Sequence, residues 1–470
     1  MPGPTYSRTR QTSEQKIRHA LEGALPKPFW LDQEGKPTTL DPLQEHTQAD
    51  LVVIGGGYSG LWTALLAKEA DPSLSVVLLE GRQVGWAASG RNGGFVESTL
   101  THGKANGERH FPSELGTLNR LGQENFDEFV TTIKRYSIDA ELEQPGMLTV
   151  ATDQYHLADF QEGGPDEQMY DQESISQLVN SPVFLAGRLE HRGVALVNPA
   201  KLAWGLQRVC LDLGVRIFEN SPALQVRDQG KTVHVRTKRG SVTAKRAALA
   251  TNAFPSLLKR NALLTIPVYD YVLMTEPLSD EQLKATGWLD RFGITDSSRQ
   301  FHYYRKTRDN RILFGGYDAI YHKGGHIRGE YEQRQETFEL LADHFFTTFP
   351  QLDVNFTHAW GGAIDMCTRL TAFQGRAYGG KVAYSAGFTG LGVASTRFGA
   401  KVMLDLLSGA DTELTRLKLV RTKPLPVPPE PLAYPLIQTM RRAIEKSDAN
   451  NGKDGLLIKA VETFGIGFDS

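Results

Sequence analysis

The segment 51–80 constrains the fold more than any other part of the chain. An apolar run over residues 51–54 leads directly into the pattern Gly55-x-Gly57-x-x-Gly60, and a second apolar run ends at Glu80. Glycines at these spacings allow a tight strand-to-helix turn and let the backbone approach a phosphate closely. The segment therefore predicts a parallel β-α-β unit that binds a dinucleotide at the N-terminus of its helix.

The acid at the end of the second strand narrows the choice of dinucleotide. Glu80 stands twenty residues after Gly60, where a carboxylate accepts hydrogen bonds from ribose hydroxyls. The same charge disfavours a 2′-phosphate on that ribose. FAD and NAD remain the two alternatives.

A second loop of small residues favours FAD over NAD. An NAD site usually continues with further α/β units, whereas here residues 88–95 read ASGRNGGF. The flavin arm of FAD extends well beyond the pyrophosphate and needs a loop without bulky side chains along it. We expect Ser89 to bond the phosphates, Arg91 to neutralise them or reach toward the flavin, and the backbone of residues 92–94 to meet the ring system.

A third glycine-rich turn lies far along the chain. The strand pattern of residues 382–386 runs into Gly387-Phe-Thr-Gly-Leu-Gly-Val393, and a helix is expected from Ala394 to Leu407. The positive end of that helix dipole, aimed at the pyrimidine edge of a flavin, would stabilise the negative charge that gathers there on reduction.

Length and composition set the remaining bounds. A chain of 470 residues exceeds what one hydrophobic core usually supports, and its formal net charge of −2 favours neither nucleic acid nor an anionic membrane as a partner. Cys210 and Cys367 are too few and too far apart for a disulfide framework or a zinc site, so we expect no metal. The polar start and the lack of a long apolar run predict a cytoplasmic protein without membrane insertion. The oligomeric state stays open.

The rest of the chain alternates between two kinds of sequence segment. Short strands and helices typical of the dinucleotide domain recur after Asn198, a predicted helix cap, while aromatic strand patterns occupy residues 267–274 and 301–305. The fold class we predict is α/β, with a Rossmann-like FAD-binding domain and an interleaved, mainly antiparallel β-sheet substrate domain. The predicted boundaries are 1–48 for an N-terminal extension, 49–136, 198–262 and 355–410 for the FAD-binding domain, 137–197 and 263–354 for the substrate domain, and 411–470 for a proline-rich connector with a helical tail.

Several motifs together resemble one family. They are LVVIGGGYSG, LLEGRQVGWAASGRNGG, RAALATNAF, RILFGG, WGG at Trp360 to Gly362, and SAGFTGLGV. The chain resembles the D-amino acid oxidase superfamily of FAD-dependent amine oxidoreductases, and within it the γ-glutamylputrescine oxidase-like branch, over roughly residues 45–410. The resemblance implies FAD across the Rossmann-like lobe, a substrate sheet over the flavin face, and oxidation of a carbon–nitrogen bond. It also implies that Ala223 lies near the adenine and Thr251 near the pyrophosphate.

One segment departs from those relatives. After WGG they usually carry a threonine followed two residues later by an acid, whereas this chain places Cys367 and Arg369 near those positions. The substrate therefore cannot be transferred from the named branch. Some relatives also tether the flavin through a cysteine in this segment, where Ile364 stands here, and we expect FAD to bind without a covalent link.

The substrate residues are predicted from strand alternation. Tyr269 and Tyr271 share one strand face, and Phe301, Tyr303 and Arg305 share another, so we expect two aromatic faces to form walls over the flavin. Packing of these tyrosines in a domain core is the alternative. Arg305 is expected to hold an anionic group of the substrate, with Arg369 as its competitor. His302 falls on the opposite face and is expected to be structural.

The function that follows is oxidation of a primary or secondary amine or an amino acid to an imine. Hydride passes to flavin N5, and the imine hydrolyses to a carbonyl compound; O2 or another electron acceptor takes up the electrons. An NAD-dependent dehydrogenase, or a flavoprotein with structural FAD and an interaction role, are the alternatives. The residues predicted to bind the cofactor are Gly55, Gly57, Tyr58, Ser59, Gly60, Glu80, Gly81, Arg82, Ala88, Ser89, Arg91, Asn92, Gly93, Gly94, Ala223, Thr251, Gly387, Thr389, Gly390, Leu391, Gly392 and Val393.

Overall fold

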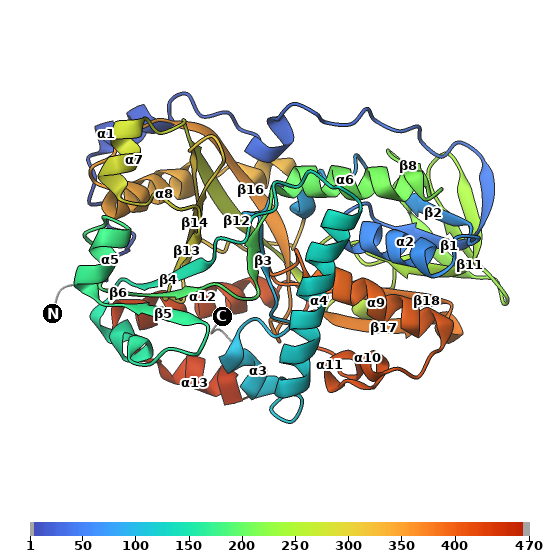
Figure 1. Cartoon of the computed structure of the whole chain (residues 1–470). Helices are drawn as coiled ribbons and strands as arrows, with labels where there is room; N and C mark the ends of the chain where they lie inside the picture. The colour runs from blue at the N-terminus through green and yellow to red at the C-terminus, as the bar shows by residue number, and fades with distance from the viewer. Residues whose placement is uncertain (1–3, 464–470) are drawn as a thin grey trace.

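Two large β-sheets stand side by side in the computed structural model, which describes residues 4–463 (Figure 1). The ends of the expected N-terminal extension and C-terminal tail, residues 1–3 and 464–470, lie outside the described residues. The first sheet carries the glycine-rich turns, and the second carries the aromatic strands. Helix α4 (Leu115–Arg135) crosses the middle of the molecule between the two halves.

The first sheet is built around the predicted β-α-β unit. Its order is β17-β18-β11-β1-β2-β8, with a β9-β10 hairpin attached to β11. Strand β1 pairs in parallel with both β2 and β11, which confirms the parallel unit predicted from segment 51–80. The bounds are β1 His46–Ile54, β2 Val76–Leu79, β8 Arg216–Phe218, β9 Gln225–Asp228, β10 Val233–Arg236, β11 Ser241–Leu249, β17 Phe373–Ala377 and β18 Val382–Ala386.

Three helices cover one face of this sheet. Helices α2 (Tyr58–Ala70), α6 (Pro199–Asp212) and α9 (Ser395–Ser408) pack through a core that contains Trp62, Leu206 and Met403. Helix α2 is apolar all round because α6 and α9 both contact it. Its N-terminus is therefore held firmly at the carboxyl edge of the parallel strands.

The second sheet is mainly antiparallel, with the order β16-β12-β15-β14-β13-β4-β6-β5. Only β13 and β4 pair in parallel within it. The bounds are β4 Met147–Ala151, β5 Glu167–Tyr170, β6 Ala186–Glu190, β12 Ile266–Thr275, β13 Gly293–Asp296, β14 His302–Lys306, β15 Ile312–Gly316 and β16 Phe356–Met366. The two sheets together confirm the predicted fold class.

The two faces of the second sheet have different partners. Helix α8 (Gln335–Thr348) covers one face, where Tyr271, Tyr304 and Phe345 belong to one buried core. The other face meets the first half of the molecule, where Val272 and Trp360 pack with Trp204 of α6. A small sheet of β3 (Phe95–Glu97) and β7 (Val194–Leu196) connects the halves.

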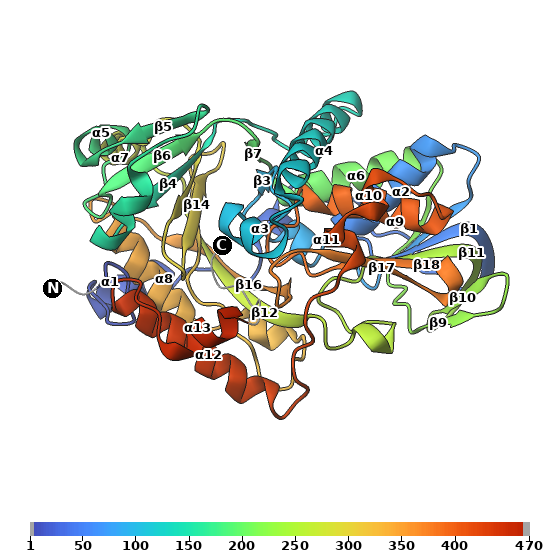
Figure 2. The same cartoon turned by 90° about the horizontal axis from the view of Figure 1, so that it is seen from below.

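The remaining helices lie around these layers. They are α1 Glu14–Leu21, α3 Lys104–His110, α5 Gln172–Leu178, α7 Asp280–Thr286, α10 Glu413–Arg416, α11 Lys418–Arg421, α12 Ala433–Ala449 and α13 Leu456–Thr463. Helices α12 and α13 follow the proline-rich connector and lie beneath the second sheet, as the view from below shows (Figure 2). The N-terminal segment runs along one edge of both halves, and its Trp30 is buried.

Candidate functional site

The three glycines of the first turn are required for different reasons. Gly55 has a φ of +114°, and a Cβ there would stand 2.3 Å from the carbonyl oxygen of Ala250. A Cβ on Gly60 would stand 1.8 Å from the carbonyl oxygen of Gly55. At Gly57 a Cβ would meet only Ser89 Oγ, at 2.8 Å, and the residue is partly exposed. Gly55 and Gly60 therefore serve the turn itself, and Gly57 leaves space in front of α2.

Glu80 lies at the end of β2, directly beside this turn. Its Oε2 accepts the backbone N–H of Gly56 at 2.6 Å, and its Oε1 accepts the N–H of Arg82 and the Trp86 indole N–H. Burial raises the pKa of Glu80, and these hydrogen bonds oppose the rise. Only one of the three bonds reaches Oε2, so this oxygen keeps acceptor capacity for a hydroxyl such as that of a ribose.

The loop 88–95 is braced by its own side chains. Ser89 Oγ accepts the backbone N–H of Tyr58 at 3.0 Å, which joins the loop to the first turn of α2. Asn92 donates to the carbonyl of Ala88 at 2.9 Å and accepts the N–H of Gly94 at 2.8 Å. The asparagine therefore fixes the loop conformation, and no part of its amide needs to reach a ligand.

Arg91 connects this loop to the edge of the second sheet. Its guanidinium donates to the carbonyls of Trp86 and Gly361 and forms an ion pair with Glu332 at 2.9 Å. A Cβ on Gly362 would stand 2.8 Å from Arg91 Cδ, which explains why this strand carries glycine beside the arginine. The sequence did not reveal Glu332 as a partner of Arg91.

The turn after β18 is held by a buried carboxylate that the sequence also did not reveal. Asp365 of β16 accepts the backbone N–H groups of Gly387 and Phe388, at 2.5 and 3.1 Å. Burial raises the pKa of Asp365 to about 7. Gly387 and Gly390 both have positive φ, and the carbonyl of Thr389 is 2.9 Å from His102 Nε2. The segment from Gly387 to Val393 is thereby positioned before α9.

The other predicted cofactor residues lie around the same two turns. Thr251 follows Ala250, whose N–H donates to Ile54 beside Gly55, and Ala223 follows Ser221, whose N–H donates to the carbonyl of Glu80. The guanidinium of Arg82 lies 4.3 Å from the centre of the Trp86 ring. Tyr58 is buried and its hydroxyl donates to the carbonyl of Pro199.

Tyr303 of β14 meets the loop 88–95 from the second sheet. A Cβ on Gly93 would stand 2.8 Å from Tyr303 Cε2, and the rings of Tyr303 and Phe95 are 5.8 Å apart. The Tyr303 hydroxyl donates to Asp270 Oδ2 at 2.5 Å. Burial raises the pKa of Asp270 to about 6, although the Tyr303 hydrogen bond opposes the rise. Asp270 is not predicted from the sequence, in which its position between two tyrosines is the only signal.

Tyr269 and Tyr271 face the other side of the second sheet. Their hydroxyls donate to the carbonyls of Arg328 and Tyr331, and both side chains belong to the core under α8. This corrects the expectation of two aromatic walls on one side. Alternate residues of β12 face opposite sides of the sheet, so Asp270 shares a side with Tyr303 and its tyrosine neighbours do not.

Arg305 and Arg369 both bind backbone carbonyls of the chain. Arg305 is buried and donates to the carbonyl of Val197 at 2.6 Å and to those of Gly93 and Gly94 at 3.5 and 3.4 Å. Arg369 donates to the carbonyls of Thr422, Ala372 and Leu419. Both guanidinium groups are closed to a substrate by burial: Arg305 donates through Nη1 alone, and its Nε, like that of Arg369, is buried without a partner among the described residues.

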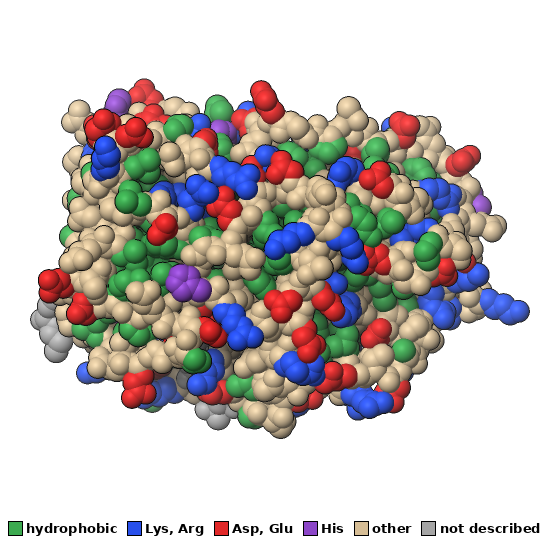
Figure 3. All heavy atoms as spheres, viewed as in Figure 1, with side chains coloured by type: hydrophobic (Ala, Val, Ile, Leu, Met, Phe, Trp, Pro, Cys, Tyr) green, Lys and Arg blue, Asp and Glu red, His purple; other side chains and the backbone are tan. Residues whose placement is uncertain are grey.

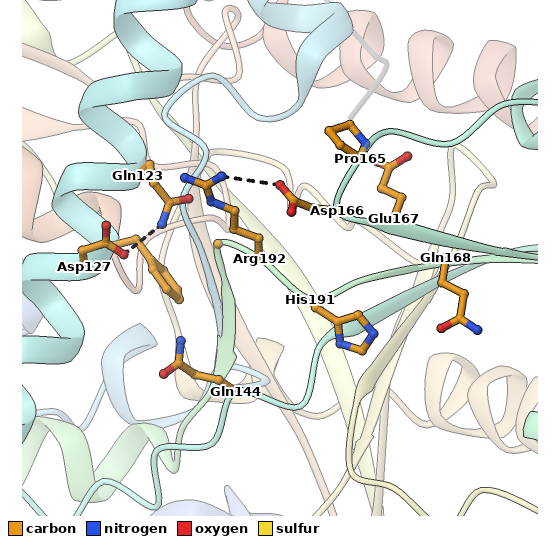
Figure 4. A pocket seen from close by; sticks show the side chains of 11 residues that line it. Gln123, Asp127, Gln144, Pro165, Asp166, Glu167, Gln168, His191 and Arg192 are labelled. Atoms are coloured by element: carbon orange, nitrogen blue, oxygen red, sulfur yellow. Dashed lines mark hydrogen bonds and ion pairs between the residues drawn. The ribbon is translucent and has the colours of Figure 1, made fainter.

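A surface hollow lies away from these residues (Figure 4). It has a volume of about 560 Å³ and lies between α4, β5 and the turn after β6. Its polar lining includes Gln123, Asp127, Asp166, His191 and Arg192, and none of the predicted cofactor or substrate residues takes part. It is not the candidate site.

The arrangement fits a bound FAD. Gly57 leaves room for a pyrophosphate at the positive end of α2, and Glu80 Oε2 retains capacity for a ribose hydroxyl. The loop 88–94 and the turn 387–393 both lie where β16 passes between the halves, which suits a flat ring system. Fold and site together define a dinucleotide-binding protein whose second sheet faces the cofactor loops.

Comparison with known proteins gives the family. Residues 50–406 match the DAO family model, described as FAD dependent oxidoreductase, and the chain belongs to this family. It is 31% identical over 81% of its length to gamma-glutamylputrescine oxidoreductase of Escherichia coli (strain K12), of which 88% is covered. It is 28% identical over 82% of its length to the probable oxidoreductase OrdL of Haemophilus influenzae, of which 89% is covered. Glycine oxidase from Geobacillus kaustophilus has the same fold, with a TM-score of 0.66 at 17% identity over 80% of this chain and 99% of that chain.

The chain is therefore an FAD-dependent oxidoreductase of a family that acts on amines or amino acids. This excludes the NAD-dependent alternative. None of the helices in the described part of the chain is long and apolar enough to span a membrane.

Proposed function

We propose that the protein oxidises the C–N bond of a primary or secondary amine or an amino acid to an imine, which hydrolyses to a carbonyl compound. When bound, FAD would supply the acceptor for the hydride, which carries the two electrons of the oxidation, and O2 or another oxidant would reoxidise it. Residues of this chain bind and orient the reactants, and α9 directs its positive end toward the cofactor loops.

One observation carries this proposal. Tyr303 of the second sheet packs on Gly93 of the loop predicted to follow the flavin, without a side chain between them. A substrate held beside Tyr303 would therefore lie against the cofactor loop. The half-buried surroundings of Phe95, Asp270 and Tyr303 would exclude much of the water that competes for the substrate nitrogen.

Anaerobic bleaching of the purified yellow protein tests the reaction. A panel of primary amines, secondary amines and amino acids is added without oxygen, and the flavin absorbance is followed. We expect at least one class to bleach the flavin, with formation of the corresponding carbonyl product. Bleaching by none of them would leave the alternative of a structural FAD with an interaction role.

We further propose that FAD is bound without a covalent link. Ile364 lies near Gly390, whereas Cys367 is buried, with its Sγ 3.2 Å from the carbonyl of Thr371. Burial also raises the pKa of the Cys367 thiol, which disfavours the nucleophilic thiolate. Acid precipitation should leave the yellow colour in the supernatant. Colour in the pellet that is lost in Cys367→Ser would contradict this.

A further inference from the structure

We propose that Asp270 binds a positively charged nitrogen of the substrate, and that the substrate is an amine without a carboxylate on its reacting carbon. This inference rests on the proposed function and narrows its substrate class. Asp270 lies on β12, on the face that meets the loop 88–95, and the residue is partly exposed. Its one side-chain partner is the Tyr303 hydroxyl, which is a neutral donor.

The chain gives the Asp270 carboxylate hydrogen bonds, from the Tyr303 hydroxyl and from the backbone of Tyr271 and Gly316, but no positive charge. None of the groups that shift its pKa is a cation, and none of the ion pairs in residues 4–463 includes it. Burial raises its pKa, so holding the carboxylate ionised at neutral pH costs folding free energy. Asp270 is a partly exposed residue beside the loop 88–95, and its ionised carboxylate destabilises the fold. This combination indicates a ligand that supplies the missing positive charge.

The nearby arginines cannot supply that charge or bind a substrate carboxylate. Arg91 is connected to Asp270 through one residue: its aliphatic stem packs on Gly362, and Gly362 pairs with Asp270 between β16 and β12. Its guanidinium is already used by Glu332 and two carbonyls. Arg305 binds the carbonyls of Val197, Gly93 and Gly94. An α-carboxylate placed beside Asp270 would therefore face a like charge without a free cation.

Aromatic rings complete a site that suits an ammonium group. Phe95 and Phe301 flank Tyr303, with ring centres 5.8 and 6.5 Å from it, and all three side chains are partly exposed. Aromatic faces attract cations, and the alkyl part of an amine also gains from burial against them. A carboxylate bonded to Tyr303, whose ring is flanked by Phe95 and Phe301, thus matches an alkylammonium better than a zwitterionic amino acid.

Two ligands without a hydrogen on the carbon next to nitrogen test the anchor without turnover. They are tert-butylamine and 2-aminoisobutyrate, which differ by a methyl group replaced with a carboxylate. Their dissociation constants are measured at pH 8 from the change in the visible spectrum of the oxidised holoenzyme and from thermal shifts. We expect wild type to bind tert-butylamine at least roughly tenfold more tightly, equivalent to about 1.4 kcal/mol.

The variants separate the charge from the packing. Asp270→Asn should weaken tert-butylamine binding at least roughly tenfold at unchanged FAD content. Tyr303→Phe keeps the carboxylate and should change the affinity less than threefold, as an estimate for a lost neutral hydrogen bond. Asp411→Asn removes an exposed carboxylate paired with Arg416 and serves as the matched control. If Asp270→Asn does not fold, the wild-type preference between the two ligands still decides.

The outcomes separate this inference from the proposed function. Equal or tighter binding of 2-aminoisobutyrate by wild type, or unchanged tert-butylamine binding by Asp270→Asn, overturns the Asp270 anchor even if an amino acid bleaches the flavin. Butylamine and the two enantiomers of norvaline give the corresponding comparison in turnover, and we expect only butylamine to bleach. Failure of every amine and amino acid to bleach the flavin overturns the proposed function, while the binding measurements still test the anchor.

Discussion

Gly57 differs from Gly55 and Gly60 because an added Cβ there would meet a side chain, Ser89 Oγ at 2.8 Å, and no backbone atom. We expect Gly57→Ala to fold but lose FAD, because its methyl group would displace Ser89 and crowd the turn where we propose that the pyrophosphate binds. We expect FAD content, measured as flavin absorbance relative to protein absorbance, to fall by more than about tenfold, which corresponds to about 1.4 kcal/mol of binding.

Gly60→Ala is the matched comparison. Its Cβ would overlap the carbonyl of Gly55, so this variant should lose folded protein as well as flavin. Normal FAD content in Gly57→Ala would show that the cofactor does not approach α2 at this residue.

The pH dependence of amine binding follows from Asp270. Its pKa in the folded protein is raised to about 6, so the carboxylate is charged above that pH and neutral below it. Amine affinity should be constant above pH 7 until the amine loses its own proton, and should fall about tenfold per pH unit below pH 6. The groups that face Asp270 are Tyr303 and Asp318, with the Arg91–Glu332 ion pair beyond Gly362.

Asp270→Asn should remove this dependence. It should also leave the melting temperature at pH 8 unchanged or raised, because the raised pKa means that ionisation of Asp270 destabilises the folded state as pH increases. A pH profile that persists in the variant would assign the titration to another group.

The two faces of β12 around Asp270 also show what the sequence cannot predict. Alternation correctly groups Tyr269 with Tyr271 and Tyr303 with Arg305, because side chains of a strand alternate between faces. Both faces of β12 are buried and rich in apolar residues, so the pattern does not reveal which face meets the cofactor loops. That choice depends on α8 covering one face, which is a contact between distant parts of the chain.

Arg305 connects β14 to the loop 88–95 through hydrogen bonds. Arg305→Met removes its hydrogen bonds to Val197 and Gly94 and leaves these buried carbonyls with fewer partners. We expect a loss of about 1–3 kcal/mol in the free energy of unfolding, together with weaker FAD binding. The measurement is urea unfolding with and without added FAD.

Substrate selectivity distinguishes this role from the one predicted from the sequence. With FAD saturating, the affinities for 2-aminoisobutyrate and for tert-butylamine should change by the same factor. A loss of affinity confined to 2-aminoisobutyrate would restore Arg305 as the anchor of a substrate anion.

Elements with local signals were the easiest to predict. The strand, glycine turn and helix at residues 51–70 lie close in sequence, and Asn198 with Pro199 marks the start of α6. The carbonyl partners of Arg305 and the carboxylate under Gly387 come from segments more than a hundred and about twenty residues away, respectively. No local pattern in the sequence encodes such pairings.

At the scale of the whole molecule, Asp318 joins the two ends of the chain to the second sheet. This buried carboxylate forms ion pairs with Arg8 of the N-terminal segment, Arg334 before α8 and Arg441 of α12. It also accepts the Thr337 hydroxyl at 2.8 Å. Asp318→Ala should cost about 1–3 kcal/mol in the free energy of unfolding, because three cations lose their shared acceptor.

Glu330→Ala is the control for Asp318, since the exposed Glu330–Arg328 ion pair should contribute less than about 1 kcal/mol. Limited proteolysis adds a second measurement, because the N-terminal segment and α12 should be cleaved faster in Asp318→Ala only. Equal rates in both variants would mean that the apolar contacts of the two segments suffice to hold them.

The position of β18 in the first sheet has a consequence for synthesis on the ribosome. β18 lies beside β11 and leads into the glycine-rich turn 387–393, yet it ends at Ala386, late in the chain. A nascent chain that already contains β1, β2, β10 and β11 still lacks the strand that pairs with residues 247–249 of β11. FAD can therefore be captured in full only after most of the polypeptide has emerged, and until then the exposed edge of β11 is a surface that chaperones have reason to shield.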